Sequence, residues 1–233
     1  MTRRYEGKIV KEAESHALTE EFLIRPPRQE RSRRAWARVL EAGASLFEEG
    51  GYEAFTIAAV CERAKVAPRA IYDRTPSKDA LLVAVYEYWV NRVWEEMRIF
   101  DDEEQWIGLD GPELVTRLFT ELGSILRRHE SFTRSLMTLS PTTHDRIYRR
   151  VQWYNRQLID RLTNLLLLAK PQITHSDPET AVQMCLIAVY SALIVHVGCG
   201  AVLAPASLDR DDFNRHLAEM ALRYLLGAEP QAA

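Results

Sequence analysis

Residues 66–82, VAPRAIYDRTPSKDALL, carry two helix-start signals in quick succession. The first is Ala67-Pro68 and the second is Thr75-Pro76-Ser77-Lys78. Proline is tolerated in the first turn of a helix, where its missing N–H has no helical partner. The segment between the signals therefore predicts a helix of about two turns, which is too short to be stable alone. Neighbouring helices have to hold it, and its small, basic, exposed side chains indicate that it is presented to a partner molecule.

The residues before this stretch predict two further helices. The first covers about 29–49 and is expected to end at Gly50-Gly51. Its inward face consists of Trp36, Leu40, Gly43 and Phe47. Thr56 is expected to cap a second helix, which runs to about residue 64 and is followed by a turn at 65–67. Two helices, a short turn and the helix at 68–74 make a helix-turn-helix, whose last helix lies in the DNA major groove.

The rest of the chain shows helical periodicity, and no stretch alternates strictly as a half-buried strand would. The expected helices span about 77–100, 110–129, 131–139, 142–170, 176–198 and 208–226. The sequence therefore predicts an all-α fold of about nine helices. We expect three parts, namely a flexible arm at 1–28, a helix-turn-helix domain at 29–76 and a larger helical domain at 77–233.

Charge is unevenly distributed along the chain, although the net charge is only −3. Residues 25–78 contain eleven Lys or Arg against seven Asp or Glu, whereas residues 79–233 contain fifteen against twenty-one. A basic N-terminal part on an acidic body is typical of a protein whose small domain binds nucleic acid. The alternative for this region is a helical hairpin whose charges only contact solvent.

The three cysteines are too widely spaced for a disulfide framework or a zinc site, which favours the reducing cytoplasm. The N-terminus lacks the apolar segment of a secretory signal. Residues 184–204 are long and apolar enough to cross a membrane. Because a helix that is apolar all round can also be buried between protein layers, we expect no membrane partner.

No recognised catalytic or metal-binding pattern occurs in the sequence, so we expect no cofactor, no metal and no catalytic residue. The histidines are scattered, and no HExxH, GxSxG, P-loop or GxGxxG pattern is present. The acidic loop at 101–104 is interpreted as solvated. One alternative remains open, a helical enzyme or ligand-binding protein with a degenerate, non-DNA-binding head. In the enzyme, His129, His144 or His196 would be the base.

Residues 33–82 resemble the DNA-binding head of the TetR (tetracycline-repressor) family of bacterial transcription regulators. The pattern consists of Val39-Leu40, Leu46-Phe47, Gly51-Tyr52, Phe55-Thr56-Ile57, Val60-Cys61, Ala64, Val66, Ile71-Tyr72 and Ser77-Lys78-Asp79-Ala80-Leu81. Three positions depart from it: Lys65 replaces a turn glycine, Ala67 replaces a Ser or Thr cap, and Thr75 replaces an aromatic residue. The resemblance implies that the body binds a ligand and dimerises.

The helix-turn-helix motif assigns roles to residues of the head. Arg69 is expected to approach the bases beside the small residues Pro68 and Ala70, while Lys65 and Ala67 lie in the adjoining turn. Thr56, Tyr72 and Lys78 are expected to hold phosphates. Further backbone or minor-groove contacts are expected from Arg28, Arg31, Arg33 and Arg34.

The body is expected to form a two-fold dimer through residues 181–198 and 208–226, because the apolar run needs more cover than one subunit supplies. The dimer would place two recognition helices on a palindromic operator. Aromatic and partly polar side chains in the body suggest a pocket. Its candidate residues are Trp89, Phe119, Phe132, Met137, His144, Tyr148 and Tyr154, with Trp94 and Trp153 as further rings. The resemblance implies that a lipophilic or aromatic effector tilts the helix that begins near Lys78 and so releases the DNA.

Overall fold

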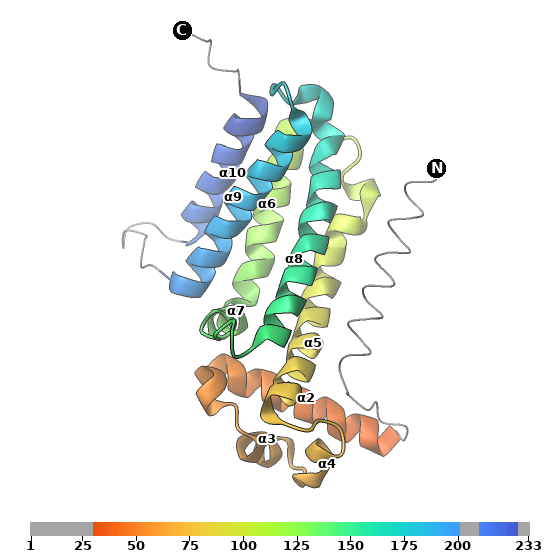
Figure 1. Cartoon of the computed structure of the whole chain (residues 1–233). Helices are drawn as coiled ribbons and strands as arrows, with labels where there is room; N and C mark the ends of the chain where they lie inside the picture. Colours follow the sequence, from red (N-terminus) through yellow and green to blue (C-terminus); the bar gives the residue numbers. More distant parts are fainter. Residues whose placement is uncertain (1–29, 201–209, 228–233) are drawn as a thin grey trace. The chain divides into compact units, whose positions relative to one another are not determined.

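The computed structural model describes residues 30–200 and 210–227 of the 233-residue chain. All regular structure in these ranges is helical, which confirms the predicted all-α fold with nine α-helices (Figure 1). The α-helices are α2 (Glu30–Ala54), α3 (Ile57–Ala64), α4 (Arg69–Tyr72), α5 (Lys78–Met97), α6 (Gly111–Arg128), α7 (Glu130–Met137), α8 (Asp145–Leu166), α9 (Pro178–Cys199) and α10 (Arg210–Leu226). Short 3-10 helices are η1 (Arg98–Asp101), η2 (Glu103–Gln105) and η3 (Leu167–Gln172). The predicted arm at 1–28 lies outside the described residues, as do Arg28, positions 201–204 of the apolar run and the expected helix start at 208.

The chain divides into two compact units, residues 1–88 and 89–233, and the division falls inside α5. The first half of this helix therefore belongs to the N-terminal unit and the second half to the C-terminal unit. The sequence-based domain boundary at residue 77 lies at the start of the same helix and stays a prediction.

The N-terminal unit is built on close contact between α2 and the first half of α5. A Cβ atom on Gly43 would lie 2.6 Å from Cγ2 of Val85, so only glycine permits this approach. As predicted, the helical conformation breaks at Gly50 and Gly51, where Gly51 has a φ of 63°. Phe55 then turns inward and contacts the edge of the Phe47 ring. These contacts build a small core under α3 and α4.

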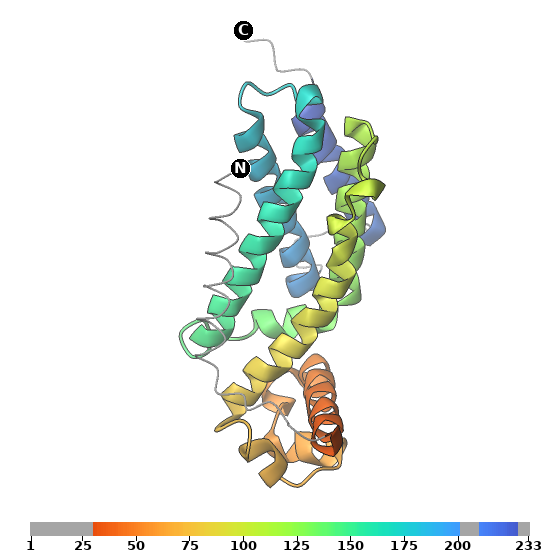
Figure 2. The same cartoon turned by 90° about the vertical axis from the view of Figure 1, so that its right-hand side faces the viewer.

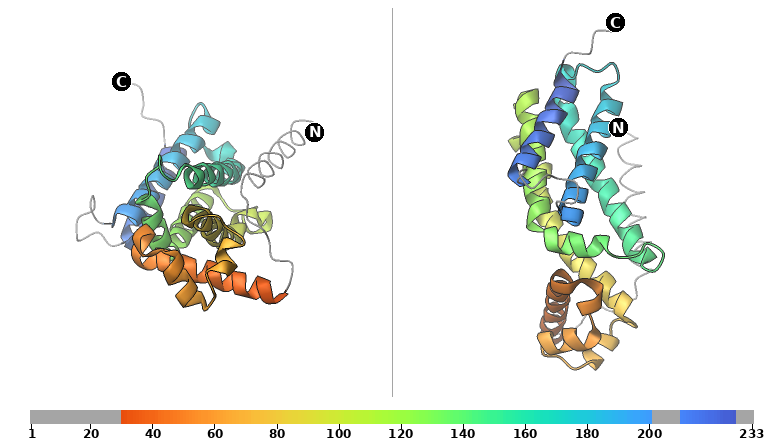
Figure 3. Two further views of the ribbon diagram at one scale, coloured as in Figure 1. Left: turned by 60° about the horizontal axis from the view of Figure 1, so that its bottom comes forward. Right: turned by 90° about the vertical axis from the view of Figure 1, so that its left-hand side faces the viewer.

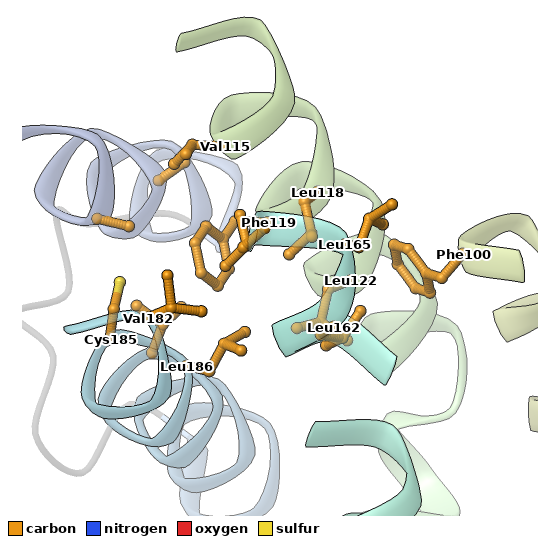
Figure 4. Close-up of a cluster of buried hydrophobic side chains, with 14 of the residues drawn as sticks. Phe100, Val115, Leu118, Phe119, Leu122, Leu162, Leu165, Val182, Cys185 and Leu186 are labelled. Carbon is orange, nitrogen blue, oxygen red and sulfur yellow. The ribbon is translucent and has the colours of Figure 1, made fainter. Parts of the chain in front are cut away.

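The C-terminal unit has a continuous apolar core between α6, α9, α10 and the second half of α8 (Figure 4). The four helices run side by side, and α10 lies against both α6 and α9 (Figures 1 and 3). Figure 2 views this unit from the side of α8 and the last turns of α5, with α9 visible behind them. Asp110 and Asp177 cap α6 and α9 by accepting hydrogen bonds from the backbone N–H groups of Glu113 and Thr180. Both helices begin within two residues of the starts expected from the sequence, at about 110 and 176.

Helix α9 has two apolar faces. One face, which includes Val182, Leu186 and Val189, is buried in the core. The other exposes Met184, Ile187 and Val195. Among the described helices, α9 alone is long and apolar enough to cross a membrane, a property that core helices share. Large apolar side chains are thus exposed to solvent along one face of α9.

Candidate nucleic-acid interface and effector region

The turn between α3 and α4 is made by a residue in the left-handed conformation. Lys65 has φ 53° and ψ 54°, and the N–H of Val66 donates back to the carbonyl of Cys61 over 3.1 Å. Thr56 caps the other end of α3, because its hydroxyl oxygen accepts from the N–H of Ala59 over 3.1 Å. Glycine adopts a positive φ without steric cost, whereas a residue with a Cβ pays for it. Lys65 therefore carries backbone strain at the entry to α4.

Helix α4 comprises only Arg69–Tyr72, shorter than the predicted 68–74. Its inner side is fixed by Ile71, which is fully buried, and by Thr75, whose hydroxyl donates to the carbonyl of Ile71. Pro68 occupies the N-cap position and makes no side-chain cap. Ala67, which stands where a capping Ser or Thr is usual, is exposed. The backbone N–H groups at this end of α4 consequently have no side-chain cap over them.

The outer side of α4 is the exposed face that the sequence predicted. Arg69 has an 89% exposed side chain and only a long contact, 3.8 Å, with the Asp73 carboxylate. Tyr72 is 55% exposed, and Pro68 is also exposed, whereas Ala70 is half-buried. A basic side chain beside small residues permits close approach to the edges of base pairs.

Lys78 is more constrained than the sequence suggested. Its ammonium group donates to the carbonyl of Tyr52 over 2.8 Å and lies 3.5 Å from the centre of the Tyr52 ring. The Tyr52 hydroxyl in turn donates to Asp79. Burial and the hydrogen bond to the Asp79 carboxylate raise the pKa of Tyr52 to about 12. Lys78 thus fixes the start of α5 to the end of α2 while keeping its positive charge at this surface.

Other basic side chains of the N-terminal unit are held by neighbours. Arg33 and Arg34 both pair with Glu30 in the first turn of α2. Arg74 donates to the Ser32 hydroxyl and lies over the ring of Trp36. Arg31 is exposed. The contacts of Tyr52 and Arg74 could not be predicted, because their partners lie 26 and 42 residues away in the sequence.

The seven predicted ligand-binding residues are distributed over α5, α6, α7, α8 and the residue before α8, and their role in ligand binding stays a prediction. Trp89 and Phe132 stack on each other with 4.3 Å between ring centres. Phe119 belongs to the main apolar core (Figure 4), and the Met137 sulfur contacts Gly198 on α9. His144 precedes α8, and the Tyr148 hydroxyl donates to the carbonyl of Leu139.

Tyr154 belongs to a second aromatic group between α5 and α8. Its ring contacts Trp94 and Trp153, with ring centres 5.8 and 4.8 Å away. The Arg161 guanidinium lies 4.3 Å from the Trp94 ring centre and pairs with Asp101 over 3.0 Å. The indole N–H of Trp153 is buried without a hydrogen-bond partner among the described residues. The group therefore combines large apolar rings with an unused donor.

Two sequence profiles match most of the chain. Residues 39–85 match "Bacterial regulatory proteins, tetR family", and residues 112–225 match "Tetracyclin repressor-like, C-terminal domain". Among curated proteins, the A-factor receptor protein of Streptomyces griseus is 35% identical over 60 residues. That match covers 26% of this chain and only 22% of the relative's length.

Solved structures with low sequence identity share the fold. A TetR-family regulator of Mesorhizobium loti has a TM-score of 0.64 at 14% identity, covering 84% of this chain and 96% of its own. FadR of Bacillus subtilis, solved in complex with stearoyl-CoA, has a TM-score of 0.58 at 15% identity, with 82% and 99% covered. The fatty acid degradation regulator FadR of Bacillus halodurans gives 0.57 at 18% identity, with 80% and 94% covered.

The strain at Lys65 leads to a prediction about stability. Replacing Lys65 by Gly should raise the free energy of unfolding by about 1 kcal/mol, because glycine adopts the left-handed conformation freely. Lys65→Ala is the matched control, since it removes the charge but keeps the Cβ. Urea unfolding followed by circular dichroism measures both. Equal stabilisation by Gly and Ala would show that charge, and not backbone strain, is responsible.

Proposed function

This chain belongs to the TetR family of DNA-binding transcription regulators, and from that premise we propose that it is a cytoplasmic repressor which a lipophilic or aromatic small molecule releases from a palindromic operator. The family is non-enzymatic, so the helical enzyme is not retained as an alternative. One observation supports the proposal most strongly: the outer side of α4 is exposed and begins with Arg69, while Ile71 on its inner side is buried in the core.

In this proposal, base reading and phosphate binding are divided between residues. Arg69 approaches the bases next to Pro68 and Ala70. Phosphates are bound by Thr56, Tyr72 and Lys78, with Lys65 and Ala67 at the edge of the contact. The Lys78 ammonium, already directed by Tyr52, supplies charge with little loss of side-chain freedom. Arg31, Arg33 and Arg34 add contacts to the DNA backbone.

Two substitutions separate base reading from phosphate binding. On DNA selected from a random pool, Arg69→Ala should change which sequence is preferred, and one mismatched contact costs about 1–3 kcal/mol. Lys78→Ala should weaken binding to all sequences alike and lower the slope of log K against log salt by roughly one. Arg98→Ala, an exposed arginine of the body, is the control and should change neither. Equal, small losses from Arg69→Ala and Lys78→Ala would mean that α4 does not enter the groove.

The exposed apolar face of α9 supports a homodimer. Together with α10 it presents large apolar side chains that are each 38–65% exposed, namely Met184, Ile187, Val195, Met220 and Tyr224. A second copy of the same two helices would cover this surface in a two-fold four-helix contact and remove the need for lipid. It would also place two α4 helices about one DNA turn apart, as a palindromic site requires.

The dimer is tested by a charge placed on this face. Ile187→Glu should convert the protein to monomers at micromolar concentration, because burying an unpaired carboxylate in an apolar contact costs several kcal/mol. Leu168→Glu changes an equally exposed side chain that lies on η3 and not on α9 or α10, and it should leave the dimer intact. Analytical ultracentrifugation distinguishes the two forms. Wild-type protein that sediments as a monomer would contradict the proposal.

A lipophilic effector is supported by the aromatic groups around α5 and by similarity in fold to regulators of fatty acid metabolism. The FadR structure of Bacillus subtilis contains stearoyl-CoA. In this chain the Trp94 ring of α5 meets the Tyr154 and Trp153 rings of α8, so an apolar molecule bound among these rings would contact α5. Binding there would tilt α5 and move the α4 helices of a dimer apart. The effector must bind the tilted state more tightly, because a ligand with equal affinity for both states shifts nothing.

Stearoyl-CoA is the first compound to test. Titrated into the complex with selected DNA, it should raise the apparent Kd at least ten-fold, whereas coenzyme A alone should not. Tyr154→Ala should reduce this effect, while Phe119→Leu, a change inside the apolar core, should preserve it. If lipophilic and aromatic compounds raise the melting temperature and leave the DNA Kd unchanged, effector-driven release is refuted.

A further inference from the structure

A charged cluster joins α5 to the corner between α6 and α7. His129 ends α6 and immediately precedes α7. Its Nε2 lies 2.8 Å from Oε1 of Glu96 on α5. The other oxygen of this carboxylate accepts from Nε of Arg128 over 2.7 Å. Glu96 therefore has one partner of fixed charge and one whose charge depends on pH.

A stack of aromatic rings joins the same helix to the same corner. Trp89 lies flat against Phe132 of α7, with an angle of 7° between the rings, and contacts the edge of His129. Trp89 and Glu96 are seven residues apart, which is about two turns, so they share one face of α5. The Trp89–Phe132 pair contains no titratable group, whereas His129 takes part in both the ring contact and the pair with Glu96. The His129–Glu96 pair is thus the adjustable part of the contact.

The pair is sheltered enough for its charge to matter. The His129 side chain is 12% exposed and that of Glu96 is 34% exposed. Burial raises the pKa of the Glu96 carboxyl, but the hydrogen bonds from Arg128 and His129 outweigh burial and leave this pKa below its ordinary value. Glu96 accordingly stays ionised across the range, near pH 6.5, in which histidines ordinarily gain a proton.

The other charged groups around this corner are arginines and one carboxylate, and these side-chain types do not ordinarily gain or lose a proton near pH 6.5. Arg92 lies on α5 between Trp89 and Glu96. Glu130 and Arg134 on α7 pair with each other. Arg128 keeps its charge throughout. A change in the contact between about pH 7.5 and 5.5 therefore reports on His129.

We propose that His129 and Glu96 are positioning residues for DNA binding, and that protonation of His129 tightens the hold of the α6–α7 corner on α5 and thereby increases DNA affinity. The proposal rests on the repressor function proposed above. Because α5 is one helix from Lys78 to Met97, its first turn carries Lys78 and its second half carries Glu96. A palindromic site accepts one separation of two recognition helices, so restricting the motion of α5 lowers the entropy lost on binding.

The size of the effect follows from the change in the charge of His129. Because Glu96 is ionised in both states, its hydrogen bond with His129 is charge-assisted throughout, and protonation adds the attraction between two opposite charges that are partly shielded from water. Protonation is therefore expected to tighten DNA binding about five-fold. An effector that tilts α5 has to break the same contact, and more of it is needed at the lower pH.

The test measures the Kd for selected DNA at pH 7.5, 6.5 and 5.5 by fluorescence anisotropy. His129→Gln and Glu96→Gln should each lose about five-fold of the tightening that the wild type shows between pH 7.5 and 5.5. His175→Gln and Glu95→Gln are the matched controls and should behave like the wild type, because His175 lies beside the carbonyl of Tyr224 and the exposed Glu95 pairs with Arg98. Comparing variants removes the contribution of other titrating groups. If the Kd of His129→Gln or of Glu96→Gln depends on pH as that of the wild type does, the proposal is overturned.

A second measurement does not need DNA. The contribution of a protonated His129 is present at low pH and lost as pH rises, so the difference in melting temperature between wild type and Glu96→Gln should be larger at pH 5.5 than at pH 7.5. If the difference in melting temperature is the same at both pH values, the proposal is overturned. This test does not need the His129 variant, so it can be made even if that variant fails to fold. Failure of the wild type to select any DNA would refute the repressor function as well, whereas selective but equally pH-dependent binding by all variants refutes the positioning role alone.

Discussion

Burial of one side chain, Ile71, is the constraint on which the DNA-binding surface depends. Helix α4 has four residues, and a helix of one turn is not stable in water by itself. Ile71 is fully buried and its carbonyl accepts from Thr75, so the core of the N-terminal unit holds α4 from behind. The outer side can then consist of small and basic residues that contribute nothing to the core. The inner side of α4 thus stabilises the helix through Ile71, and the outer side, with Arg69, is left to contact DNA.

Helix α5 places a second constraint on the chain, because its two halves belong to different compact units. Lys78 ties its start to Tyr52, and Gly43 lets α2 approach it closely. Its second half carries Trp89 and Glu96, which contact the corner between α6 and α7, and Trp94, which contacts Tyr154 on α8. A regulator that couples a ligand to DNA needs an element common to both functions. In the mechanism proposed above this helix is that element, and the proposed effector contact and the His129–Glu96 pair both involve it.

Signals that act within a few residues were readable from the sequence, and contacts across the fold were not. Thr56, Asp177 and the Gly50-Gly51 break act through backbone groups one to four residues away, and each was placed correctly. The exposed face of α4 followed from its spacing and charge. Helical periodicity, in contrast, says that a ring faces inward but not which helix it meets. Phe119 packs in the main core and Trp89 stacks on Phe132, and neither of these partners could be predicted from the sequence. The hydrogen bond from Lys78 to the carbonyl of Tyr52 could not be predicted for the same reason, because the two residues are 26 positions apart.

The central claim is that two copies of α4 read DNA together, and selection of bound sequences from a random DNA pool tests it most directly. The account predicts enrichment of a two-fold symmetric site whose half-sites lie about one helical turn, roughly 10 base pairs, apart. The Arg69→Ala variant, selected in parallel, should alter the same position in both halves. Enrichment of a single asymmetric site, or no enrichment at low salt, would contradict the account.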